Sequence, residues 1–226
     1  MQDIINAIIF DLDGVIINSN PAIETFWKSW ADKEGLTLTD PMIHEWIYGR
    51  KVGDTINGLF DHVPDTRKKE IEQSAYDFDS HMQPGAIDGV VEFISLLNTW
   101  HIPLGVVTSS HHSRMLAMLR NLGIEDTFTC FVTANDVTRG KPHPDPYLKM
   151  SAKMNLPNHA CLVFEDAVSG IQSAVAAGMH SIGIGNEYSK KDLLLHGAAD
   201  VVIDFTHIHI TGEYLFVNNR SLFRIS

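Results

Sequence analysis

Two aspartates, Asp11 and Asp13, follow the apolar run AIIF and stand two residues apart. In an extended chain this spacing places both side chains on one face. The two carboxylates would repel each other unless a cation or a shared proton lies between them. A hard divalent cation with oxygen ligands removes the repulsion, and Mg²⁺ is the usual ion where phosphate is bound. Glu165 and Asp166 end a second apolar run and supply further carboxylates.

The same Asp-x-Asp-Gly pattern is also compatible with an acidic turn or part of a calcium loop. The EF-hand template fails because its fifth position would be Val15, which offers no oxygen ligand. The spacing recurs at Asp77 and Asp79 in a helical stretch that no strand precedes, and there it is interpreted as a solvated helix face. The acidic turn therefore remains open as an alternative for the first pair.

Two further segments carry groups that suit a phosphate. Lys141 stands in the segment RGKPHPDPY, where prolines stiffen the chain. It can cap a turn at the surface, or be a fixed positive charge that anchors phosphate above a cluster of carboxylates. Thr108, Ser109 and Ser110 end one element and open a helix, so hydroxyl and N–H groups can bind an anion there. An ordinary N-cap is the alternative.

The periodicity of the chain predicts the elements that position these residues. From residue 86 to about 210, strand-like apolar runs alternate with helical patterns, which indicates a parallel sheet covered on both faces. Between Pro21 and about Met82 apolar residues recur at helical spacing, without a convincing strand. We therefore expect an α/β fold with a Rossmann-like three-layer core, residues 1–14 and 86–210, and a small inserted helical cap, residues 15–85. Residues 211–226 have no clear period and stay unassigned.

The predicted sheet explains why these segments belong to one site. In such sheets ligands bind beyond the carboxyl ends of the strands. Asp11, Thr108 and the Glu165–Asp166 pair all fall at such ends. Three strand ends therefore converge on one predicted site.

Charge and composition exclude several classes of partner. The chain has 226 residues, with 17 Lys+Arg against 28 Asp+Glu and a formal charge of −11, which disfavours nucleic acid and anionic membranes. The densest basic run, Arg67 to Lys69, is followed at once by Glu70. No apolar run approaches the roughly 20 residues of a membrane span, and the N-terminus lacks secretory features. We expect a cytoplasmic protein with reduced Cys130 and Cys161 and no obligate protein partner.

The segments DLDGVIINS, TSS, GKPHPDPY and FEDAVSGIQSAVAAGM, in this order, resemble the four motifs of the haloacid dehalogenase (HAD) superfamily of phosphohydrolases. The resemblance covers about residues 4 to 205. The helical insertion resembles the cap of the β-phosphoglucomutase and sugar-phosphatase branch. The segments SNPAIETFW and TANDVTRGKPHPDPYLK are similar to the glycerol-3-phosphatase and 2-deoxyglucose-6-phosphate phosphatase group. The resemblance thus implies a HAD-like fold and phosphatase activity.

Roles for the acidic residues follow from this resemblance. It implies that Asp11 is the nucleophile that forms an aspartyl-phosphate. Asp13 would act as general acid toward the leaving alkoxide and then as general base toward water. The cofactor would be Mg²⁺, held by Asp11, the backbone carbonyl of Asp13 and Asp166. Glu165 would be a direct or an indirect ligand of the same ion.

The resemblance also assigns the remaining groups of the site. Lys141 would neutralise Asp11 and the phosphate, while Thr108 and the N–H of Ser109 would hold the phosphoryl oxygens. On the cap, Arg50 and Lys51 fall where relatives carry a substrate loop, and a solvated pair is the alternative. Mutases of this branch carry a histidine about twelve residues after the nucleophile, where this chain has Ile23.

These observations predict a Mg²⁺-dependent phosphomonoesterase that hydrolyses small sugar or polyol phosphates through an aspartyl-phosphate. A phosphomutase like β-phosphoglucomutase is the first alternative. A noncatalytic protein that binds phosphate ligands on the same fold is the second, although it usually lacks the nucleophile or the lysine, and both are present here.

Overall fold

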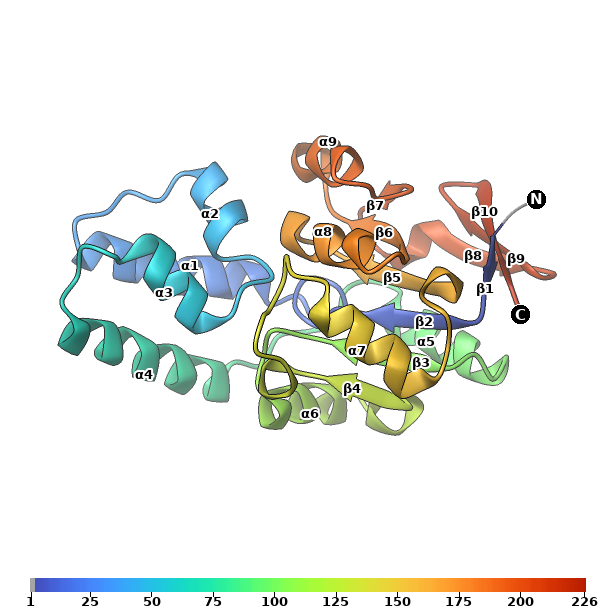
Figure 1. The fold of residues 1–226 in the computed structure, drawn as a ribbon, viewed down its shortest axis with the longest axis horizontal. Coiled ribbons are helices and arrows are strands. Elements are labelled where there is room, and N and C mark those ends of the chain that lie inside the picture. Colours follow the sequence, from blue (N-terminus) through green and yellow to red (C-terminus); the bar gives the residue numbers. More distant parts are fainter. Residues whose placement is uncertain (1–2) are drawn as a thin grey trace.

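The computed structural model describes residues 3–226, which form a sheet-based core and a separate group of helices (Figure 1). The core holds a six-stranded sheet in the order β4-β3-β2-β5-β6-β7, with every neighbouring pair parallel. Its strands are β2 (Ala7–Phe10), β3 (Leu104–Val107), β4 (Cys130–Val132), β5 (Cys161–Glu165), β6 (His180–Ile184) and β7 (Val201–Val202). All residues of β2, β3 and β5 are buried, which explains their continuous apolar runs.

Helices cover both faces of this sheet. On one face, α5 (Val90–Thr99) and α6 (His112–Asn121) pack with Ile8 and Phe10 of β2. On the other face, α7 (Asp145–Met154) and α8 (Val168–Ala176) pack with Ala7 and Ile9. Helix α9 (Glu187–Leu195) packs beside α8. Alternate residues of β2 thus point to opposite layers, and the predicted three-layer α/β architecture is confirmed.

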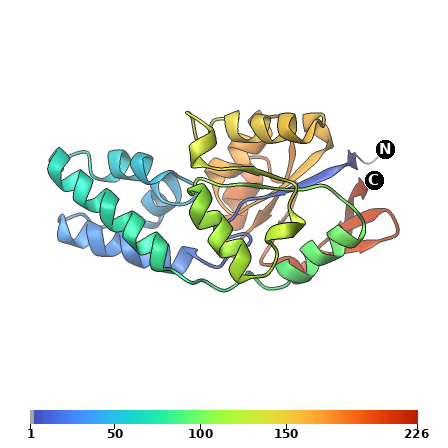
Figure 2. The same ribbon diagram turned by 90° about the horizontal axis from the view of Figure 1, so that it is seen from below.

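Four helices lie between β2 and α5 in the chain and form the cap. They are α1 (Asn20–Lys33), α2 (Asp40–Trp46), α3 (Val52–Leu59) and α4 (Asp65–His81). The cap has its own apolar core, which includes Trp27, Trp30 and Phe60. Its two connections to the α/β core meet where Ile17 forms a backbone bridge with Ala86. Figure 2 shows the cap projecting from one end of the core.

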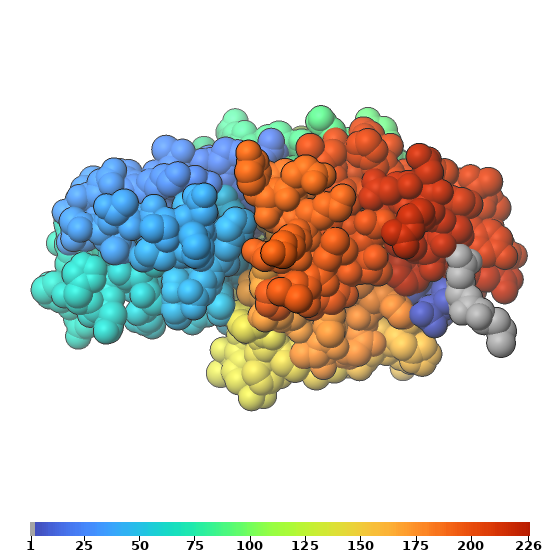
Figure 3. All heavy atoms as spheres, turned by 90° about the horizontal axis from the view of Figure 1, so that it is seen from above, coloured from blue at the N-terminus to red at the C-terminus, as the bar shows by residue number. Residues whose placement is uncertain are grey.

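The C-terminal segment without a clear sequence period forms strands. β8 (Ile208–Thr211), β9 (Tyr214–Val217) and β10 (Arg220–Ile225) join β1 (Ile4–Ile5) in a second sheet, in the order β1-β10-β9-β8. Asn218 and Asn219 form the β9–β10 turn at φ 50° and 61°, as a two-residue hairpin of this kind requires. Leu215 and Phe223 extend the apolar core. This sheet lies at the end of the molecule opposite the cap (Figures 1 and 3).

Within residues 3–226, no helix has the length and apolarity that a membrane crossing requires.

Candidate active site

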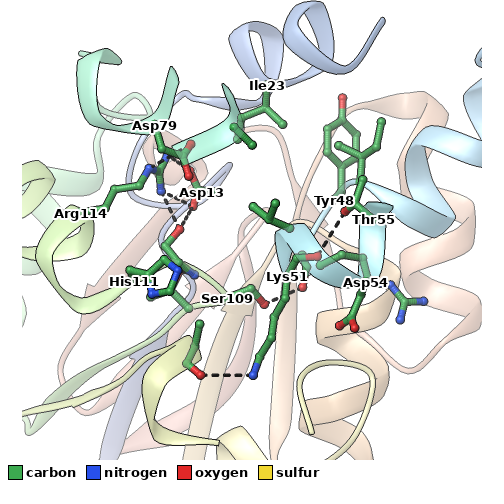
Figure 4. Close-up of a pocket in the computed structure, with 18 of the residues that line it drawn as sticks. Asp13, Ile23, Tyr48, Lys51, Asp54, Thr55, Asp79, Ser109, His111 and Arg114 are labelled. Atoms are coloured by element: carbon green, nitrogen blue, oxygen red, sulfur yellow. Dashed lines mark hydrogen bonds and ion pairs between the residues drawn. The ribbon is translucent and has the colours of Figure 1, made fainter. Parts of the chain in front are cut away.

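A pocket of about 290 Å³ lies between the cap and the carboxyl ends of the core strands. Asp11, directly after β2, and Thr108, directly after β3, line its core side. Residues of α1, α3 and α4 line its cap side. Figure 4 shows that Asp13 and Arg114 lie on one side of this pocket, whereas Lys51 and Ser109 lie on the other. The topology therefore brings two of the predicted strand-end residues, Asp11 and Thr108, and the cap to one cavity.

Lys141 is buried beside Asp11, behind the surface of this pocket. Its Nζ lies 2.5 Å from Asp11 Oδ1 and 2.5 Å from Glu165 Oε1, and it donates to the Val107 carbonyl at 3.2 Å. The hydroxyl of Tyr147 donates to the same Glu165 oxygen at 2.6 Å. The side chains of Lys141 and Glu165 are 1% and 0% exposed. Lys141 is therefore a fixed internal charge, and the alternative of a surface turn cap does not apply.

The buried charges perturb one another strongly. Burial raises the pKa of Asp11 from 3.8 to about 7, and nearby carboxylates add to the rise, although Lys141 opposes it. Burial alone would lower the pKa of Lys141, but the attraction of Asp11 and Glu165 keeps that pKa above its usual value. One lysine thus faces two carboxylates, of which Asp11 lines the pocket, with Asp166 beside them. The protein supplies less positive charge here than negative charge.

The residues around Asp166 fit a hard metal cation. One oxygen each from Asp11, Glu165 and Asp166 lies within 4.8 Å of the others. Asp166 Oδ2 accepts a hydrogen bond from Asn20 Nδ2 at 2.5 Å, whereas the buried Oδ1 has no partner among the described residues. Burial, followed by the charges of Asp11 and Glu165, raises the pKa of Asp166 well above 3.8. A divalent cation would satisfy the orphaned oxygen and the excess charge together.

The backbone at Gly14 leaves room for this cluster. Gly14 has a φ of +75°, and a Cβ atom at this position would overlap the carboxylate of Asp166 and the amide of Asn20. Glycine therefore meets both the left-handed backbone and the close approach of Asp166. The Asp-x-Asp-Gly segment is a turn, but one packed against further acidic groups and not an isolated surface turn.

Asp13 has a different environment from Asp11. The guanidinium of Arg114 makes a bidentate contact with its carboxylate, at 2.8 Å and 2.7 Å. The hydroxyls of Ser19 and Ser110 donate to the same carboxylate at 2.5 Å and 3.0 Å. Burial would raise the pKa of Asp13, but the charge and hydrogen bonds of Arg114 hold it below 3.8. Its side chain does not belong to the Asp11, Glu165 and Asp166 cluster.

Thr108 and Ser109 both line the pocket. The Thr108 side-chain oxygen accepts a hydrogen bond from the Ser110 N–H at 3.0 Å, and the Ser109 hydroxyl donates to the Gly49 carbonyl of the cap at 2.8 Å. Helix α6 begins only at His112, with His111 as its N-cap residue. Thr108 is therefore not a helix N-cap, and its position at the end of β3 faces the Asp11 side of the cavity.

Arg50 and Lys51 reach the rim of the pocket, but both cations already have partners. Lys51 Nζ donates to the carbonyls of Ala134 and Val137, at 3.2 Å and 2.7 Å. Arg50 donates to the carbonyls of Glu45 and Lys141, at 2.9 Å and 3.4 Å. Both side chains thus connect the cap loop to neighbouring backbone. Both residues are partly exposed.

Sequence reasoning missed Arg114 and misjudged Asp79. Asp79 is not on a solvated face: it lines the pocket from α4, and its Oδ1 lies 3.4 Å from Arg114 Nε. The prediction of a solvated face holds for Asp77, which is exposed, but is wrong for Asp79, because the C-terminal end of α4 lies against the core helix α6. Arg114 follows Ser110 by one helical turn and precedes the buried Met115. A charged residue on the apolar face of α6 is the signal that could have identified it.

Comparisons with known proteins agree with this architecture. The chain is 30% identical over 207 residues to hexitol phosphatase A of Escherichia coli, covering 86% of this chain and 92% of that protein. It is 31% identical over 221 residues to glycerol-1-phosphate phosphohydrolase 2 of Saccharomyces cerevisiae, covering 88% and 82%. It is 26% identical over 214 residues to β-phosphoglucomutase of Bacillus subtilis, covering 89% and 93%.

The strongest assignment comes from the family comparison. The sequence model of the haloacid dehalogenase-like hydrolases matches residues 8–184, which run from β2 through β6 and include the whole cap. The match therefore contains every residue placed at the pocket above, and leaves the β8–β10 strands outside it. The chain belongs to the haloacid dehalogenase-like hydrolase family.

Proposed function

We propose that this protein is a Mg²⁺-dependent phosphomonoesterase that hydrolyses small sugar or polyol phosphates through an aspartyl-phosphate on Asp11. The observation that carries the proposal is the buried cluster of Asp11, Lys141 and Asp166, of which Asp11 lines a cap-covered pocket. Relatives named as hexitol and glycerol-1-phosphate phosphatases support the substrate class. The volume of about 290 Å³ suits a small ligand.

Asp11 is the proposed nucleophile because it directly follows β2 and lines the pocket. Its Oδ1 is held by Lys141, which leaves Oδ2 to attack phosphorus. The P–O bond to Asp11 forms as the bond to the substrate alkoxide breaks, and water later displaces the aspartate. The ammonium of Lys141 reduces repulsion between the carboxylate and the phosphate, while Thr108 and the Ser109 N–H hold phosphoryl oxygens.

Mg²⁺ would be held by Asp11, Asp166 and the Asp13 backbone carbonyl, and when bound it would neutralise the negative charge that gathers on the transferring group. Glu165 is better suited to support than to direct binding. One of its oxygens already accepts hydrogen bonds from Lys141 and Tyr147, so its carboxylate chiefly fixes the lysine. Of the two roles expected for Glu165, a direct or an indirect ligand of the ion, we therefore propose the indirect one.

Asp13 is the proposed general acid and base. Because its pKa is low, Asp13 must first take up a proton, from solvent or from the monoanion of the bound phosphate ester, before it can give one to the departing alkoxide. As base it would then take a proton from the attacking water. It lines the same cavity as Asp11, but its separate hydrogen bonds keep it apart from the acidic cluster. Two carboxylates two residues apart are thus assigned different roles because their surroundings differ.

A phosphomutase remains the second candidate because of the similarity to a β-phosphoglucomutase. The apolar Ile23 lines the cap side of the pocket where such mutases carry a histidine (Figure 4). Transfer to a second sugar hydroxyl needs a polar group near that hydroxyl, and Ile23 cannot supply one. Hydrolysis by water is therefore favoured.

A substrate panel tests the proposal. Glycerol 1-phosphate, hexitol phosphates and glucose 1-phosphate would be incubated with the protein and either Mg²⁺ or EDTA. We expect inorganic phosphate only with Mg²⁺, and its loss in Asp11→Asn. The control Asp77→Asn removes an aspartate of the cap surface and should keep full activity. Phosphate release that survives Asp11→Asn would contradict the nucleophile, and conversion of glucose 1-phosphate to its isomer, seen by NMR, would favour the mutase.

A further inference from the structure

Arg114 bridges the acid–base carboxylate and the cap. It lies on the core helix α6, yet its guanidinium contacts Asp13 beside β2 and approaches Asp79 on the cap helix α4. The Arg114 side chain is 6% exposed, and those of Asp13 and Asp79 are 19% and 25% exposed. Figure 4 shows Asp13, Arg114 and Asp79 side by side at one edge of the pocket. A buried arginine shared between two carboxylates from two domains suggests a role beyond packing.

The contacts of Asp13 define what Arg114 does to it. A carboxylate offers about four lone-pair positions for hydrogen bonds. Oδ1 of Asp13 accepts from Ser19 and Arg114, and Oδ2 accepts from Ser110 and Arg114. All four positions are therefore occupied, and half of the donors belong to one side chain. The bidentate contact fixes the plane of the carboxylate as well as its position.

This occupancy has a consequence for proton transfer. Asp13 cannot donate a proton to an alkoxide, or accept one from water, until one of the four contacts is released. The serine hydroxyls can release it by rotating, while the bidentate contact of Arg114 keeps the carboxylate in place. The buried Nε of Arg114 makes no hydrogen bond among the described residues and lies 3.4 Å from Asp79 Oδ1. Asp79 belongs to the cap helix α4, so the position of the cap would affect the guanidinium and, through it, the orientation of the carboxylate.

We propose that Arg114 is a positioning residue that orients the Asp13 carboxylate for proton transfer and, through Asp79, couples that orientation to the cap. The inference rests on the proposed function, since it requires Asp13 to be the acid and base. It adds a residue that acts through Asp13 and makes no hydrogen bond to Asp11. It also gives the α4 end of the cap a part in the chemistry beyond covering the pocket.

Two substrates separate this role from a merely structural one. The alkoxide of glycerol 1-phosphate needs a proton to depart, whereas the p-nitrophenolate of p-nitrophenyl phosphate departs without one. The quantity to compare is kcat/KM, because it reports the steps up to departure of the leaving group. Damage to the fold would lower kcat/KM for both substrates alike. Loss of a well-placed acid would lower it mainly for the alkyl ester.

The experiment compares wild type with Arg114→Gln and Arg114→Lys in the presence of Mg²⁺. We expect Arg114→Gln to lower kcat/KM for glycerol 1-phosphate by about 100-fold, with a loss at least tenfold smaller for p-nitrophenyl phosphate. Arg114→Lys should fall between wild type and Arg114→Gln, because a lysine keeps the charge but not the planar fork. The matched control is Arg120→Gln on the exposed face of α6, which should change neither value.

Asp79→Asn tests the link to the cap and serves if Arg114→Gln does not fold. It keeps the bidentate contact but removes the second carboxylate, so it should lower the alkyl-to-aryl ratio of kcat/KM about fivefold. An unchanged ratio in Arg114→Gln would overturn the positioning role, and an unchanged ratio in Asp79→Asn would overturn the link. If wild type hydrolyses neither ester, the proposed function itself fails and this inference fails with it.

Discussion

The two walls of the pocket differ in how their charges are held. On the core wall, Asp11 follows the end of β2 and is paired with the buried Lys141, which is also paired with Glu165 at the end of β5. On the cap wall, Lys51 and Arg50 are bonded to backbone carbonyls. The core wall therefore has unbalanced charge that a metal and a phosphate can complete. The cap wall has its cations satisfied, so it can shape specificity without anchoring the phosphate.

Removal of the metal, which acts on the core wall, should have the largest effect on activity. With Mg²⁺ chelated by EDTA we expect phosphate release to stop, because one lysine alone cannot offset two carboxylates and an incoming phosphate. Asp166→Asn removes the carboxylate whose Oδ1 is orphaned. It should raise the Mg²⁺ concentration for half-maximal activity by at least about tenfold. Isothermal titration calorimetry with Mg²⁺ alone compares wild type with Asp166→Asn in the absence of substrate. Equal Mg²⁺ affinity in the two proteins would contradict Asp166 as a ligand.

Removal of Lys141 should be the next largest effect, and it should appear in stability. Lys141→Met leaves Asp11 and Glu165 buried without their cation, which costs about 3–5 kcal/mol of unfolding free energy. Urea unfolding in EDTA measures this loss, and Mg²⁺ should recover part of it. Lys51→Met is the matched control, since that lysine donates to partly buried backbone carbonyls and has no carboxylate partner. A loss no larger than that of the control would contradict the account of the core wall.

The pH dependence of stability should sharpen the same contrast. The folded state raises the pKa of Asp11 to about 7 from 3.8, and raises that of Asp166. The stability linked to these groups is present below pH 4 and is lost as pH rises through 7. The lowered pKa of Asp13 changes the folding stability only below pH 4, so it does not oppose this trend.

Thermal unfolding checks the trend between pH 5 and pH 8. In EDTA the Tm should fall with rising pH, whereas Mg²⁺ at about 100 times its Kd should raise the Tm by about 5–10 °C at pH 8. The increase should be smaller at pH 5, where protonated Asp11 competes with the ion. If Mg²⁺ raises the Tm equally at pH 5 and pH 8, these carboxylates are not its ligands.

The smallest effect is expected on the cap wall. Lys51→Met should change kcat by less than about threefold, because the lysine holds Ala134 and Val137 carbonyls and leaves the phosphate to Lys141. A modest rise in KM would fit a looser cap loop. A fall in kcat as large as that of Lys141→Met would show that the cap cation anchors the phosphate directly, and would reverse the comparison between the walls.

The two walls also differ in how far the sequence predicts them. Continuous apolar runs and strand-end carboxylates place Asp11, Thr108 and Asp166 at one sheet edge, because parallel strands align their carboxyl ends. Helical spacing predicts the cap helices but not which of their faces meets the core. The Asp79–Arg114 pair therefore could not be foreseen from residues 35 positions apart. The C-terminal hairpin lacked a period because its short strands are interrupted by turns and a register shift.

The central claim is that Asp11 carries the transferred phosphoryl group. A rapid-quench experiment with ³²P-labelled glycerol 1-phosphate and Mg²⁺, followed by peptide mapping, tests it most directly. We expect label on the peptide that contains Asp11, release of that label by hydroxylamine as for an acyl phosphate, and no label in Asp11→Asn. Label on another residue, or label that persists in Asp11→Asn, would contradict the account.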